Sequence, residues 1–169
     1  MAATGLTLFA CTGTNPRTSS PAPNTPAGPS RSSSNAPSGV FDEIKACDLL
    51  SPITSARGFQ DPQEAQYESD NGCQTLKPRY GSVSTYLVDN AGIDQYDKGE
   101  GAQRPTTVSG RDAVEISGFG GSTSACLIGL SVTPHARVSV SLTLTTGTNE
   151  QACVDVRPIA ERIAAQLPR

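Results

Sequence analysis

The five cysteines have the most definite chemistry in this chain, because a thiolate can ligate a metal, exchange electrons or form a disulfide. They stand at positions 11, 47, 73, 126 and 153. A metal or redox centre would call for Cys-x-x-Cys spacing or several histidines. The chain has no such spacing and a single histidine. We therefore predict no metal site and no cofactor, and two structural disulfides among the last four cysteines.

Four cysteines allow three connectivities, and the sequence alone does not choose among them. Our prediction is Cys47–Cys73 together with Cys126–Cys153. These pairs close loops of 26 and 27 intervals, and chain entropy predicts about 3.5 kcal/mol of stabilisation from each. A domain with 5% aromatic residues and no tryptophan has reason to need such crosslinks.

Two groups of carboxylates could carry chemistry. A pair of carboxylates could hydrolyse a glycan, and the candidates for such a pair are Asp61, Glu64, Glu68 and Asp70. Surface carboxylates around a polar loop explain them more simply. A calcium loop would need glycine at its sixth position, where Asp94 stands if Asp89 is first. We therefore interpret the second group as a solvated acidic loop, whose members are Asp89, Asp94, Asp97 and Glu100.

The remaining candidates for catalysis are also weak. His135 lies in a predicted turn, Thr133–Ala136, and a serine triad would need it beside a nucleophile. Neither Gly-x-Ser-x-Gly nor Ser-x-x-Lys occurs. The glycine-rich segment 118–122 lacks the strand-to-helix context of a phosphate-binding loop, so we interpret it as a flexible loop. We predict no catalytic residue and expect that the protein is not an enzyme.

The N-terminal segment has the pattern of an export signal. Leu8-Phe9-Ala10-Cys11 resembles a bacterial lipobox, which implies that Cys11 becomes the diacylated first residue of a mature lipoprotein. No Lys or Arg precedes Cys11, so we expect the true start to lie upstream. The alternative is an intracellular chain whose apolar start is accidental. The lipobox predicts a protein anchored by lipid to the extracytoplasmic face of the cell membrane.

The chain divides into a signal remnant (1–11), a tether (12–40) and a globular domain (41–169). The tether is rich in Pro, Ser and Thr and has no apolar periodicity, so we expect it to be disordered. Residues 41–169 carry 11 basic and 16 acidic residues, a net charge of −5. Because the basic residues form no run or stripe, nucleic acid is not an expected partner. We expect a monomer.

The strands of the domain are predicted by alternation of apolar and polar residues. Val138, Val140, Leu142 and Leu144 give the clearest case, with Ser or Thr between them. Cys126 shares the core-facing parity of the strand before it, and Ser109-Gly110 predicts a tight hairpin. The predicted strands are Cys73–Arg79, Ser82–Val88, Thr106–Val108, Arg111–Ser117, Cys126–Val132 and Val138–Thr145.

Helices are predicted at both ends of the domain. The first runs from Phe41 to Leu50 and ends near Ser51-Pro52, because the residue before a proline disfavours helical geometry. The last has Val156 and Ile159 on its apolar face. Pro158 fits its first turn if Asp155 is the cap, or kinks a helix that begins near Glu150. A weak helix is expected around 93–98. Together these elements predict an α+β fold, a mostly antiparallel sheet with an N-terminal and a C-terminal helix packed on it.

Four segments carry a family resemblance: Ala46–Pro52, Asn71–Gln74, Val108–Glu115, and the final helix from Cys153 to Pro168. Together they resemble the small actinobacterial lipoproteins catalogued as domain of unknown function 3558, over about residues 42 to 168. The aromatic residue that this family places soon after its second domain cysteine is absent, and Gln74-Thr75-Leu76 stands there instead. The resemblance implies fold and location but no reaction.

These observations favour a membrane-anchored lipoprotein that binds an envelope ligand or protein partner, or serves as an accessory domain. Two alternatives remain open. One is an envelope glycan hydrolase with paired carboxylates, and the other is a purely structural surface lipoprotein. The sequence identifies no ligand-binding residue.

Overall fold

The structure is a computed structural model that describes residues 39–97 and 101–169. The predicted lipidation residue Cys11, the predicted signal remnant and nearly all of the predicted tether lie outside the described residues, as does Glu100. The predictions made for them therefore stay predictions. Within the described residues, no helix has the length and apolar character needed to span a membrane.

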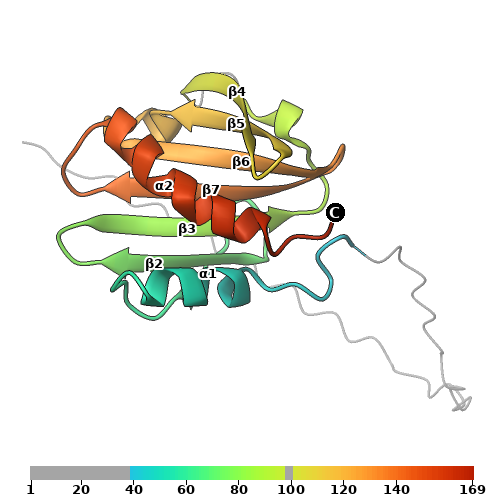
Figure 1. The fold of residues 1–169 in the computed structure, drawn as a ribbon, viewed down its shortest axis with the longest axis horizontal. Helices are drawn as coiled ribbons and strands as arrows, with labels where there is room; N and C mark the ends of the chain where they lie inside the picture. The colour runs from blue at the N-terminus through green and yellow to red at the C-terminus, as the bar shows by residue number, and fades with distance from the viewer. Residues whose placement is uncertain (1–38, 98–100) are drawn as a thin grey trace, which may run out of the picture. The chain divides into compact units, whose positions relative to one another are not determined.

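One sheet organises the described residues, with strand order β1-β2-β3-β7-β6-β5-β4 (Figure 1). Every neighbouring pair is antiparallel. Pairing of β3 with β7 joins the early strands to the late ones. The bounds are β1 Gln63–Glu64, β2 Gly72–Lys77, β3 Gly81–Val88, β4 Ala102–Val108, β5 Arg111–Ser117, β6 Ala125–Thr133 and β7 Ala136–Leu144.

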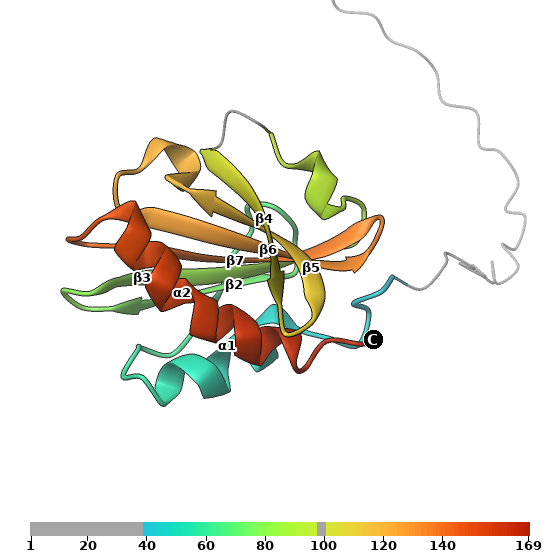
Figure 2. The same cartoon turned by 45° about the horizontal axis from the view of Figure 1, so that its top comes forward.

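Helices α1 (Ala46–Ser55) and α2 (Asn149–Ala164) lie on the same face of the sheet (Figures 1 and 2). The core forms where the apolar parity of the strands meets the helices, and it includes Leu50 of α1, Val140 of β7 and Ile159 of α2. The alternation predicted for β7 is therefore confirmed, because all four of its apolar residues belong to this core. The predicted α+β architecture is confirmed as well.

The first helix differs from the prediction at both ends. It begins at Ala46, whose backbone N–H donates to the side-chain oxygen of Asn71 at 2.9 Å. It also continues through Pro52 to Ser55. A proline inside a helix costs about 3 kcal/mol, but burying one large apolar side chain contributes roughly 1.5 to 3 kcal/mol. This helix buries several such side chains, so packing outweighs the local preference; they are Leu49, Leu50 and Ile53.

The last helix begins before Pro158, in agreement with the second of the two alternatives. Its N-cap is Thr148, whose hydroxyl oxygen accepts a hydrogen bond from the Gln151 backbone N–H at 3.3 Å. A start capped by Asp155 is wrong. The early start buries one further turn against the sheet, including Ala152 and Cys153. Burial of this turn against the sheet again outweighs the disruption that a proline causes inside a helix.

Two loop predictions are refined. The helix expected around 93–98 is only a 3-10 turn, η1, over Ile93–Gln95. The tight hairpin at Ser109-Gly110 is confirmed, since φ is +52° at Ser109 and +79° at Gly110, as a two-residue hairpin turn requires. Strand β4 begins at Ala102, earlier than expected, because it pairs with β5 along its whole length.

Both predicted disulfides are present. Cys47–Cys73 joins α1 to β2, and Cys126–Cys153 joins β6 to α2. Each therefore ties a helix to the sheet beneath it. The second also sets the position of α2 beside β4 and β5, where two hollows of about 530 Å³ each lie.

Candidate functional site

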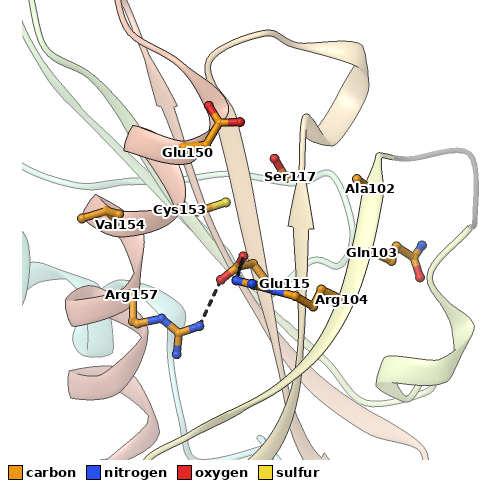
Figure 3. Close-up of a pocket in the computed structure, with 9 residues that line it drawn as sticks. All are labelled: Ala102, Gln103, Arg104, Glu115, Ser117, Glu150, Cys153, Val154 and Arg157. Carbon is orange, nitrogen blue, oxygen red and sulfur yellow. Dashed lines mark hydrogen bonds and ion pairs between the residues drawn. The ribbon is translucent and has the colours of Figure 1, made fainter.

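A groove of about 530 Å³ lies between α2 and the β4–β5 hairpin (Figure 3). Its floor holds the side chain of Glu115 and the sulfur of Cys153, and its walls carry charged residues from both sides. Clefts of about 300 to 1,000 Å³ with a few convergent polar groups are typical ligand sites. The lining residues are Ala102, Gln103, Arg104, Glu115, Ser117, Glu150, Cys153, Val154 and Arg157.

Strand pairing places two of the charged residues together. In the β4–β5 register Arg104 lies directly opposite Glu115, and directly opposed residues project from the same face of a sheet. That face is the one covered by α2. Arg157 follows Cys153 by four residues on the helix, about one turn, so it lies on the same side of α2 as the disulfide. The disulfide to β6 thus helps to hold Arg157 over the groove.

Glu115 is a buried carboxylate that is bound by two arginines. It is 6% exposed. Arg104 Nη2 donates to Oε1 at 2.6 Å, and Arg157 Nη2 donates to Oε2 at 3.0 Å. Both carboxylate oxygens are therefore occupied. Charge-assisted bonds of this kind hold the two guanidinium groups in defined positions at one end of the groove.

The two arginines differ in their surroundings. The side chain of Arg104 is 70% exposed, whereas that of Arg157 is 32% exposed. Arg157 also donates from Nη1 to the Thr107 carbonyl at 3.4 Å and from Nη2 to the Thr106 hydroxyl at 3.3 Å. Arg157 is thus the more firmly positioned of the two.

Glu150 supplies a negative charge at the other end of the groove (Figure 3). It lies in the first turn of α2. A hydrogen bond from its own backbone N–H, followed in importance by one from the Thr148 side chain, lowers the pKa of its carboxyl group. Since the ordinary pKa of glutamate is already well below 7, Glu150 is ionised at neutral pH.

A second buried ion pair lies on the face of the sheet without helices. Arg137 Nη2 donates to Glu68 Oε2 at 3.1 Å, and the Ser139 hydroxyl donates to the same oxygen at 2.6 Å. The Arg137 guanidinium stacks on the Tyr96 ring, 4.1 Å from its centre, and Nη1 donates to the Gly92 carbonyl at 3.1 Å. Burial raises the pKa of the Tyr96 hydroxyl. These contacts attach two loops to the sheet, and we interpret this cluster as structural.

The four carboxylates considered for hydrolysis are not brought together as one group. Glu68 is occupied by Arg137. Glu64 and Asp70 line a hollow of about 350 Å³ near the start of α1, whereas Asp61 lines a different hollow of about 340 Å³.

The histidine and the glycine-rich segment considered for chemistry both lie in turns. His135 is exposed in the turn between β6 and β7. The glycine-rich segment forms a 3-10 turn, η2, over Phe119–Gly121. Within the described ranges, no group of three or more His, Cys, Asp or Glu residues could hold a metal ion.

Our sequence reasoning missed the three residues that form the ionic cluster of the groove. Glu115 offered a signal, because it has the core-facing parity of β5, shared with Ala113, and a lone charged residue is rarely buried without a partner. Arg104 could then have been found by counting across the predicted hairpin. Arg157 could not, since it comes from a distant helix.

Comparison with known proteins gives one match. A family model described as Protein of unknown function (DUF3558) matches residues 6–166. No curated protein matches the chain, and no solved structure does.

Proposed function

This chain belongs to the family described as Protein of unknown function (DUF3558), and on that premise we propose that it is an exported, lipid-anchored ligand-binding domain. The groove between α2 and the β4–β5 hairpin is the binding site. The observation that carries this proposal is the groove itself, in which a buried glutamate positions two arginines beside an open volume of about 530 Å³. Such groups orient a ligand rather than stabilise a core.

Three further features support the proposed location. The lipobox ending at Cys11 and the Pro-rich tether are typical of a protein displayed at the outer face of a membrane. The two disulfides suit an oxidising, extracytoplasmic compartment, because reducing conditions in the cytosol keep most thiols free.

Native mass spectrometry of the protein extracted gently from its own membrane tests the binding function. We expect a ligand mass beyond that of the lipidated polypeptide, and we expect the double variant Arg104→Gln/Arg157→Gln to lose it. Arg162→Gln is the matched control, because Arg162 is an exposed arginine on α2 outside the groove. Wild-type protein that carries no ligand, or a ligand that the double variant retains, would contradict the proposal.

Cys11→Ser tests the anchor. Without the cysteine sulfur no lipid can be attached, so we expect the variant to move from the membrane fraction to the soluble fraction. Immunoblots of fractionated cells measure the change, and the mass of the wild-type N-terminal peptide shows whether acyl chains are present. Unchanged retention of the variant in the membrane fraction would refute lipid anchoring through Cys11.

A further inference from the structure

The groove has charges of opposite sign at its two ends. At one end Arg104 and Arg157 share one carboxylate, that of Glu115, which leaves a formal charge of +1. At the other end stands Glu150, exposed and ionised. Figure 3 shows the uncharged Ser117 side chain and the Cys153 sulfur between these ends. A ligand that complements this arrangement carries an anion and a cation at its two extremities.

The distance between the ends restricts the length of such a ligand. Glu150 and Arg157 are seven residues apart on the same helix, and at 1.5 Å per residue this is about 10 Å along the axis. A free amino acid is too short, because its ammonium and carboxylate are separated by a single carbon atom. An extended chain covers about 3.3 to 3.6 Å per residue, so three residues span about 10 Å.

The chemistry of the arginines agrees with a carboxylate. Each guanidinium has five N–H donors in a planar fork, and Glu115 engages one nitrogen of each. Arg157 also donates to Thr106 and Thr107, so Arg104 keeps more N–H groups for a second carboxylate than Arg157 does. Phosphorylated or polyanionic ligands are disfavoured, since the charges of Glu115 and Glu150 offset those of the two arginines over the groove as a whole.

We propose that the ligand is a short peptide of about three residues with free ends, whose carboxylate binds at Arg104 and Arg157 and whose ammonium binds at Glu150. This inference rests on the proposed function and names its ligand class. Recognition of both ends, with no charged group between them, makes the site selective for length and for free termini rather than for particular side chains.

The test titrates the full chain, purified without lipid, with a randomised tripeptide pool that has free ends. Backbone amide signals of Glu150, Ser117 and Arg157 are followed by NMR. The same pool with an amidated C-terminus, with an acetylated N-terminus, or with both blocks serves for comparison. We expect amidation to weaken binding about tenfold or more, since it removes charge-assisted hydrogen bonds. Acetylation should weaken binding about threefold, as an exposed ion pair contributes little.

Variants assign each end of the peptide to its residue. Arg157→Gln should weaken binding of the free pool but have little further effect on the amidated pool, and Glu150→Gln should behave likewise with the acetylated pool. Arg162→Gln and Glu161→Gln are the matched controls, because both alter exposed residues of α2 outside the groove. Equal binding of the free and doubly blocked pools, or no binding of the free pool, would overturn the inference.

These outcomes are distinct from failure of the proposed function. If native mass spectrometry detects a ligand that depends on Arg104 and Arg157 while the tripeptide pool does not bind, only the ligand class is wrong. If no such ligand is detected, the binding function itself is contradicted.

Discussion

Cys126→Ala/Cys153→Ala is expected to lower the free energy of unfolding by about 3.5 kcal/mol, because the disulfide restricts a 27-residue loop of the unfolded chain. The corresponding fall in Tm is roughly 10 to 20 °C for a domain of this size. Since small domains are stable by only about 5 to 15 kcal/mol, this is a large share of the total. Urea denaturation followed by circular dichroism measures it.

The other disulfide is a matched control for this prediction. Cys47–Cys73 closes a loop of 26 residues, so chain entropy predicts nearly the same loss for Cys47→Ala/Cys73→Ala. The two variants should differ at the groove, because Cys153 lines it. We expect the amide signals of Glu150 and Arg157 to shift only when Cys126–Cys153 is removed. A loss of less than about 1 kcal/mol in either variant would contradict the assigned stabilising role.

Arg137→Ala is expected to destabilise the fold by about 3 to 5 kcal/mol, because it leaves the Glu68 carboxylate buried without its counter-charge. The two side chains are only 10% and 11% exposed. The variant also removes the guanidinium that stacks on Tyr96. Urea denaturation of the wild type and the variant at neutral pH measures the difference in their free energies of unfolding.

Arg104→Ala is the control for this second prediction. Arg104 also pairs with a buried glutamate, but it is 70% exposed, and Glu115 keeps a second partner in Arg157. The expected loss is therefore within about 1 kcal/mol, as for most exposed ion pairs. In a double-mutant cycle, the free energy of unfolding should fall less for Arg137→Ala/Glu68→Ala than the falls of the two single variants added together. The structural interpretation of the pair fails if Arg137→Ala costs no more than Arg104→Ala.

Much of the fold could be predicted because its signals are local. Alternation in β7, the parity of Cys126 and the Ser109-Gly110 turn each depend on residues close together in the chain. The hairpin even determines that Arg104 faces Glu115, since both lie five residues outside the turn. The pairing of Arg104 with Glu115, one part of the ionic cluster in the groove, could therefore be predicted from the sequence.

The helix ends were less predictable because two preferences compete there. Local geometry places a boundary at Pro52 and a first turn at Pro158, but both prolines lie inside helices. Each helix gains more from burying apolar side chains against the sheet than it loses at its proline. That gain depends on the surface that the helix meets, which no short window of sequence contains.

The sequence by itself determined the approximate positions of β2 to β7, the tight hairpin and the even number of domain cysteines, because these follow from neighbours along the chain. Only the tertiary structure decided that α2 crosses the sheet beside β4 and β5. This brings Arg157 to Glu115, 42 residues away in the chain. A contact of that separation forms only when a whole helix packs on a whole sheet, so the groove and its opposed charges are properties of the folded domain.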